Sequence, residues 1–196
     1  MDDTAVLIEA HYLDLISKEL GLNGDKRIDI KNLAVNMAKE NNLWCKEVFF
    51  YTCPPFQSSK PTVDESSRKA KYDKFKDRLQ KRNINVREGR LQKLKILRDG
   101  KPAERFTEKG VDTLFTIDLL KLKEKYGIKT AILLTCDTDF VPVIKAAKEE
   151  GTKVILYYYT DNKNKTHFSL SYYLANACDS KVLLTEQLLK QATFSS

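Results

Sequence analysis

Short apolar runs that alternate with helical patterns constrain the fold of this chain most. Segments 5–8 (AVLI), 131–134 (AILL) and 154–159 (VILYYY) are apolar at successive positions rather than at every second one. Strands of this composition are buried on both faces, as in a parallel sheet covered by helices. The sequence therefore predicts an α/β fold with a central, mostly parallel sheet and helices on both faces.

Periodicity and turn residues predict the remaining elements. Helical spacing of apolar residues predicts helices at 12–20, 30–38, 65–82, 107–126, 140–150 and 168–177, and a last one near the C-terminus. Strand patterns occur at 47–52 and 181–184, and a strand or hairpin is predicted within 84–97. A loop is expected at 57–64, and turns at 21–24 and 99–100. Thr107 is expected to cap a helix, and Gly127 and Gly151 to end two others.

Length and composition fit one globular domain over residues 1–196. The chain is 42% hydrophobic and 31% charged, and it contains no run of 18 apolar residues, so no membrane span is predicted. Its acidic start is unlike a signal peptide, which favours the cytoplasm. The four cysteines form no CxxC pair, which favours reduced thiols over a zinc site. Cys136 and Cys178 lie in apolar stretches and are expected to pack as small hydrophobes.

The positive charge of the chain is concentrated in residues 60–105. This segment has 16 Lys/Arg and 7 Asp/Glu, whereas the rest of the chain has 18 and 20. An anionic polymer such as RNA is expected to bind such a segment through its phosphates. The candidate contacts are Arg68, Lys69, Lys71 and Arg90. The alternative interpretation of this basic segment is a helix face that is exposed to solvent and binds no ligand. Tyr72, Phe75 and Tyr157 are expected in the core or on the surface, with base stacking as their alternative role.

Carboxylates follow two predicted strands, at the edge where parallel sheets bind ligands. Glu9 directly follows the first strand, and Asp137 and Asp139 follow the strand at 131–134. Such oxygen ligands suit Mg²⁺ or Mn²⁺. The alternatives are capping of the next helix by the two aspartates and a salt bridge for Glu9. The sequence has no GxSxG, Walker A or HExxH motif. A bound metal ion would need no protein nucleophile, because it can generate hydroxide from water.

Two further aspartates lie on the helix after the basic segment. Asp112 shares a helical side with Phe115 and Leu119, so it is expected at the margin of the buried face, where a carboxylate needs a partner. Asp118 lies nearer the middle of that face and has the same requirement. A first-turn position favoured by the helix dipole is the alternative for Asp112.

Four stretches resemble motifs of the NYN domain family of PIN-like nucleases. LLTCDTDFVPV (133–143) is similar to that family's strand followed by S-G-D-S-D-F-x-P-x-[VL]. KGVDTLFTIDLL (109–120) is similar to its K-G-V-D-x-x-x-x-x-D-[LM]-[LV] motif. GTKV (151–154) and LANACD (174–179) resemble later parts of the pattern. The matches extend from the first strand to about Leu184.

The resemblance implies a three-layer PIN-like fold and hydrolysis of RNA phosphodiester bonds with Mg²⁺ or Mn²⁺. It implies that Asp112, Asp137 and Asp139 are acidic site residues, with Lys109 beside them and Asp118 in a second tier. The first motif departs from the family's D-G-x-N, since IEAHY stands at 8–12. Glu9 is one methylene, about 1.5 Å, longer than aspartate. Ala10 replaces glycine, and His11 replaces an amide and can hydrogen-bond a phosphate or ligate a metal.

The leading hypothesis is a metal-dependent endoribonuclease. Its metal ligands and catalytic residues are Glu9, Asp112, Asp137 and Asp139, supported by Lys109, Asp118 and His11. RNA is the expected partner; DNA cleavage and a homo-oligomer stay open. The altered first motif supports the alternative, a catalytically weak or inactive RNA-binding or regulatory protein of the same family. A module that binds proteins is a third possibility, which an exposed apolar patch would support.

Overall fold

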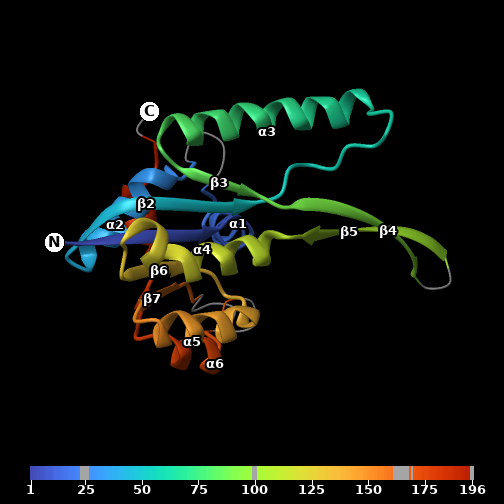
Figure 1. Ribbon diagram of the computed structural model, residues 1–196. Coiled ribbons are helices and arrows are strands. Elements are labelled where there is room, and N and C mark those ends of the chain that lie inside the picture. Colours follow the sequence, from blue (N-terminus) through green and yellow to red (C-terminus); the bar gives the residue numbers. More distant parts are fainter. Residues whose placement is uncertain (23–26, 99–100, 161–167, 169, 195–196) are drawn as a thin grey trace.

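A computed structural model describes residues 1–196 except 23–26, 99–100, 161–167, 169 and 195–196. Six parallel strands form the main sheet in the order β3-β2-β1-β6-β7-β8, and most of them follow one another down the view in Figure 1. The predicted parallel α/β sheet is thereby confirmed. The strands are β1 (Asp2–Glu9), β2 (Leu43–Thr52), β3 (Asn85–Glu88), β6 (Thr130–Leu134), β7 (Lys153–Tyr158) and β8 (Ser180–Leu183).

Helices cover both faces of this sheet because successive strand residues point to opposite sides. In β1, Val6 and Ile8 enter one apolar cluster and Ala5 and Leu7 the other, and all four side chains are fully buried. The first cluster includes residues of α1 (Ala10–Glu19), α2 (Ile30–Glu40), α3 (Val63–Lys81) and α7 (Glu186–Gln191). The second includes residues of α4 (Val111–Tyr126), α5 (Val141–Glu149) and α6 (Tyr172–Ala177). Three layers result.

The order of the strands reverses between β1 and β6. From β1 the chain runs outward through β2 to β3, and then returns to place β6 on the other side of β1, with Ile8 opposite Leu134. The connections that leave the carboxyl ends of β1 and β6 therefore diverge. In open α/β sheets the resulting crevice is where ligands bind. Glu9 and residues 135–139 lie there.

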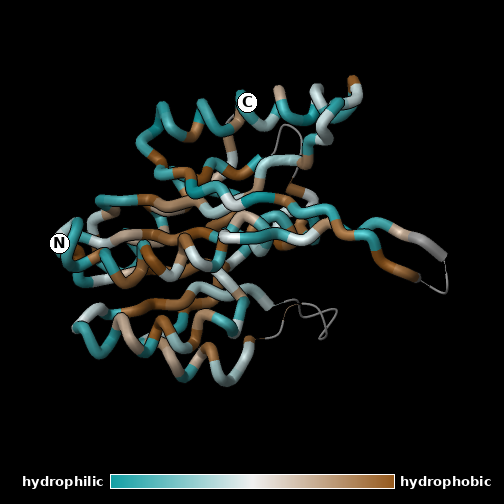
Figure 2. The backbone as a smooth tube through the Cα atoms, turned by 45° about the vertical axis from the view of Figure 1, so that its right-hand side comes forward, coloured by the Kyte–Doolittle hydropathy of each residue, from teal (hydrophilic) through white to brown (hydrophobic). Residues whose placement is uncertain are grey.

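A second, two-stranded antiparallel sheet projects from the body of the molecule (Figures 1 and 2). We call this sheet, β4 (Arg90–Arg98) and β5 (Lys101–Lys109), the arm. Its base packs tightly on the body at Gly89, whose N–H donates to the carbonyl of Thr52 at 2.9 Å. A Cβ at Gly89 would lie 2.6 Å from the Lys109 oxygen and from a Val111 methyl, so glycine is required there. The predicted turn at 99–100 lies outside the described residues.

Several predicted boundaries were wrong. Thr107 does not cap a helix, because it pairs with Gln92 in the arm; α4 begins at Val111 after Gly110, whose φ is +86°. The helix predicted from residue 168 begins only at Tyr172, since Phe168 packs edge-on against Tyr159 in the core. The predicted loop at 57–64 is shorter, because Thr62 caps α3 at its start.

Other predicted ends of helices agree with the structure. Gly127 and Gly151 follow α4 and α5 with positive φ, as predicted. The helix predicted at 140–150 is preceded by a single 3-10 turn, η2 (Thr138–Phe140). Residues 23 and 24 of the turn predicted at 21–24 lie outside the described part of the chain. In the described part of the chain, no helix combines the length and apolar character needed to cross a membrane.

Candidate functional site

Thr135 joins the carboxyl ends of β1 and β6. Its hydroxyl donates a hydrogen bond to Oε2 of Glu9 at 2.6 Å and accepts one from the backbone N–H of Asp137 at 3.1 Å. Thr135 is fully buried, whereas Glu9 and Asp137 at the two ends of this bridge are half-buried. Sequence reasoning did not single out Thr135. The available signal was a hydroxyl residue directly after a buried strand and two residues before the first aspartate.

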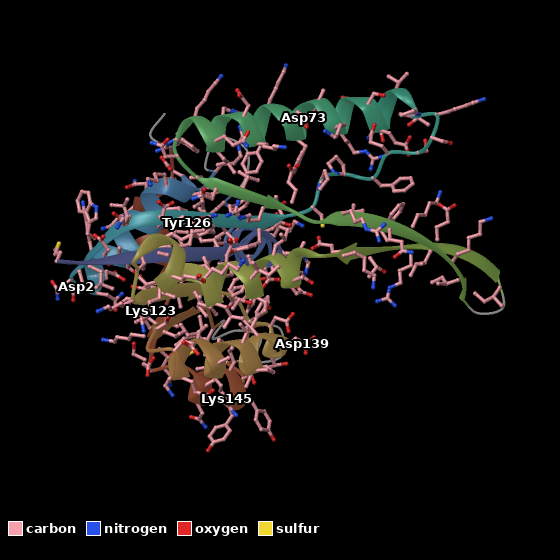
Figure 3. The ribbon with its side chains drawn as sticks, viewed as in Figure 1. Asp2, Asp73, Lys123, Tyr126, Asp139 and Lys145 are labelled. Carbon is pink, nitrogen blue, oxygen red and sulfur yellow. The ribbon has the colours of Figure 1, made fainter. Side chains whose placement is uncertain are left out.

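Asp137 and Asp139 share one tight turn after β6. Oδ1 of Asp137 accepts the N–H of Asp139 at 2.8 Å, so Asp137 caps η2 as the alternative interpretation predicted. The cap uses one of its two carboxylate oxygens. Asp139 is exposed, and Figure 3 places it at the side of the molecule opposite Asp2, the amino end of β1. Cys136 in the same turn is exposed, so its predicted burial was wrong, whereas Cys178 is buried as predicted.

Asp112 lies on the first turn of α4, and it is exposed rather than at the margin of the buried face. The expectation that it needs a partner was therefore wrong. Partial desolvation raises the pKa of Asp112, and the charges of Asp137 and Asp139 raise it further. These shifts show that residues from α4 and from the turn after β6 share one electrostatic environment.

Glu9 belongs to the same environment. Burial is the main cause that raises the pKa of Glu9, and the charges of Asp137 and Asp112 add to it. The Thr135 hydrogen bond and the neighbouring His11 act in the opposite direction. Glu9 forms no ion pair with any residue that the structure describes, so its salt-bridge alternative is not observed.

We call Glu9, Asp112, Asp137 and Asp139 the acidic cluster. Within the described residues, no three Asp, Glu, His or Cys side chains lie close enough together to hold a metal ion as they stand. The cluster is thus a set of mutually repelling carboxylates rather than a finished coordination shell. Of the supporting candidates, His11 is exposed on the first turn of α1, and Lys109 is exposed at the end of β5, three residues before Asp112.

Asp118 lies apart from the acidic cluster. It is six residues beyond Asp112, about 9 Å along the helix axis. Asp118 is only 8% exposed and accepts hydrogen bonds from Nε and Nη2 of Arg87, at 2.7 and 3.1 Å, and from the Tyr51 hydroxyl at 3.1 Å. The partner that the sequence required for Asp118 is therefore Arg87, which links α4 to β3.

A cleft of about 320 Å³ adjoins Glu9. It lies between the start of α1, the end of β2, α3 and the junction of β5 with α4. Its lining is formed by Glu9, Ala10, His11, Asp14, Phe50, Tyr51, Thr52, Cys53, Tyr72, Phe75, Glu108 and Val111. The cleft therefore places polar and aromatic side chains beside Glu9 of the acidic cluster.

The basic candidates differ in how free their charges are. Arg68 and Lys69 each pair with an acidic residue one turn away on α3, Asp64 and Asp73. Lys71 on α3 and Arg90 on the arm are exposed.

Tyr157 and Phe75 take the predicted packing roles: Tyr157 is fully buried, and Phe75 packs on Phe50. The Tyr72 hydroxyl donates to Glu88.

Glu9→Gln is expected to raise the melting temperature of the metal-free protein at neutral pH. The folded-state pKa of Glu9 is above its ordinary value of 4.5, so the folded protein binds this proton more tightly than the unfolded chain. Stability associated with Glu9 is therefore greatest below that ordinary value and falls as pH rises through the folded-state pKa. Glutamine removes the ionised form. Thermal melts at several pH values measure the effect.

The same melts contain their own control. Below the ordinary pKa of glutamate, wild type and Glu9→Gln should melt alike, because both side chains are then neutral. An equal difference at every pH would trace the effect to packing and contradict the electrostatic explanation.

Comparison with known proteins agrees with this architecture. The NYN domain family model matches residues 3–185. A solved structure of a protein of unknown function from Vibrio parahaemolyticus RIMD 2210633 is similar, with 15% identity, a TM-score of 0.56, and coverage of 98% of this chain and 96% of that chain. At this identity the likeness shows a shared fold. A search of curated proteins finds no match. Because the family match spans nearly the whole chain, the protein belongs to the NYN domain family of the PIN-like superfamily.

Proposed function

We propose that this protein is a ribonuclease that hydrolyses RNA phosphodiester bonds with Mg²⁺ or Mn²⁺ at the acidic cluster. One observation carries the proposal: carboxylates from three separate segments influence one another near the point where the strand order reverses, and their charges help to raise the pKa values of Glu9 and Asp112. Membership in a family of the nuclease type supports it. The four free cysteines suit the cytoplasm, where we expect the enzyme to act.

The donor set fits a hard divalent cation. The four side chains of the cluster offer carboxylate oxygens, which Mg²⁺ and Mn²⁺ prefer. A bound cation would relieve the repulsion that the raised pKa values report. When bound, such an ion lowers the pKa of a water molecule and stabilises negative charge on a phosphate. Asp112 and Asp139 are exposed, so their carboxylates are accessible to a cation from solvent.

Other residues would position this machinery. The buried Thr135 hydroxyl holds one oxygen of Glu9 and fixes the start of the turn that contains Asp137 and Asp139. Lys109, three residues from Asp112, would contact the phosphate of the substrate, and His11 beside Glu9 would donate a hydrogen bond to it. Asp118 is assigned to the support of α4 through Arg87 rather than to the reaction.

The direct test is cleavage of a labelled single-stranded RNA by purified protein. Cleavage is expected with Mn²⁺ or Mg²⁺ and is expected to stop when EDTA removes the metal. A labelled DNA of the same sequence, run in parallel, tests the preference for RNA. Cleavage that persists in EDTA would contradict the metal mechanism.

A specific observation favours a second candidate, an RNA-binding member of the family without turnover. The first motif reads IEAHY rather than D-G-x-N, and the described carboxylates are not gathered into a metal-ready group. RNA binding that is unchanged by EDTA, together with no cleavage under any metal condition, would select this candidate.

A further inference from the structure

The arm has its charges sorted between its two faces. In an antiparallel ribbon, directly opposed residues share a face and successive residues alternate. The register pairs Arg90 with Lys109 and Leu94 with Arg105, so these residues lie on one face, together with the pair Gln92 and Thr107. We call this the basic face, since these six residues include three cations and no acid. The other face carries Leu91, Lys93, Lys95, Glu104, Phe106 and Glu108, in which the charges balance.

The balanced face is turned towards α3 and the segment before it. The ring centres of Phe106 and Phe56 lie 5.2 Å apart, and Nζ of Lys93 lies 5.7 Å from the centre of the Phe56 ring. Lys93 also pairs with Glu104 at 2.6 Å, and Glu108 lines the cleft beside Tyr72. The basic face therefore looks away from α3.

The cations of the basic face are free to bind a ligand. Arg90, Arg105 and Lys109 are exposed, and none of them forms an ion pair with a residue in the described ranges. In contrast, Arg68 and Lys69 of α3 are already paired with acids of their own helix. These cations of the arm can therefore bind an anion without first breaking an ion pair with another described residue.

The basic face is continuous with the acidic cluster. Lys109 lies three residues before Asp112, and the arm projects from the side of the molecule where Asp139 lies (Figures 1 and 3). From Lys109 outward to Arg105 is four residues of strand, about 13 Å. At about 3.4 Å per stacked nucleotide, this distance spans about four nucleotides.

We propose that the basic face of the arm grips the phosphate backbone of an RNA strand about four nucleotides from the bond held at the acidic cluster. This inference rests on the proposed ribonuclease function and adds a minimum substrate length to it. A face with several cations and no acid matches a row of phosphates, and Gln92 and Thr107 add hydrogen-bonding groups between the charges. The grip is sequence-independent and salt-sensitive.

The test compares two substitutions on the same ribbon. Arg105→Gln removes a cation from the basic face, and Lys95→Gln removes one from the balanced face; both side chains are exposed, so both variants should fold. Binding of a labelled 12-nucleotide RNA is measured in EDTA at several salt concentrations. Arg105→Gln is expected to weaken binding about 3- to 10-fold and to lower the salt slope by about 0.7. Lys95→Gln should stay within about twofold of wild type.

A length series completes the test. Wild type should bind the 12-nucleotide RNA more tightly than a 4-nucleotide RNA, and Arg105→Gln should lose most of this preference. Equal effects of the two substitutions, or no RNA binding by wild type, would overturn the proposal. The proposal would also be overturned if wild type formed dimers that Arg105→Gln disrupts and Arg105→Gln did not weaken RNA binding. Because binding is measured without metal, an Arg105 effect with no cleavage would keep the grip and remove the nuclease proposal.

Discussion

Asp137→Asn is expected to lower metal-dependent RNA cleavage by more than about 100-fold, since even partners of metal ligands cost 10- to 100-fold when removed. Asp137 is central to the acidic cluster, because its charge contributes to the raised pKa of both Glu9 and Asp112. Asparagine keeps an oxygen that can accept the Asp139 N–H, so the turn should persist. The substitution therefore removes charge with little change in geometry. Initial rates under Mn²⁺ measure the effect.

Two further measurements make this result specific. Asp3→Asn removes a carboxylate at the amino end of the same strand as Glu9, where it pairs with Lys46 on the surface, and its cleavage rate should equal that of wild type. Mn²⁺ should raise the melting temperature of wild type but not that of Asp137→Asn, because ligand binding to the folded state stabilises it. Equal cleavage by wild type and Asp137→Asn would point to a contaminating nuclease and leave the acidic cluster without a catalytic role.

Local patterns were sufficient to predict that the main sheet is parallel and covered on both faces. The runs at 5–8 and 131–134 are apolar at every position because both faces of β1 and β6 are covered, and this burial is what a parallel sheet requires. The rule that ligands bind at the carboxyl ends then located Glu9, Asp137 and Asp139. The structure brings these residues and Asp112 into one environment.

Features that depend on contacts between distant segments could not be predicted. Strand pairing with Gln92 holds Thr107 in the arm, although threonine is equally suited to cap a helix. Helical phase showed that Asp118 needs a partner, but nothing local identifies Arg87, 31 residues earlier in the chain. The separation of charges between the two faces of the arm likewise depends on the pairing register of β4 and β5. A count of basic residues along the sequence gives no information on that register.

Asp118→Ala is expected to lower the free energy of unfolding by about 2–4 kcal/mol, because breaking a buried ion pair leaves the remaining charge without compensation. The Arg87 side chain is 27% exposed, so part of the full penalty is relieved by water. The fully buried Tyr51 would also lose the acceptor of its hydroxyl. Denaturant melts of the purified variant measure the change.

A matched control and a double substitution show what kind of interaction this is. Asp77→Ala breaks an exposed pair with Lys81 on α3 and should cost less than about 1 kcal/mol. Arg87→Met combined with Asp118→Ala should be less destabilising than the sum of the single changes, because neither charge is then left alone. Strict additivity would mean that the two side chains do not stabilise each other. If Asp118→Ala abolished cleavage in folded protein while leaving stability unchanged, Asp118 would belong to the site rather than to the support of α4.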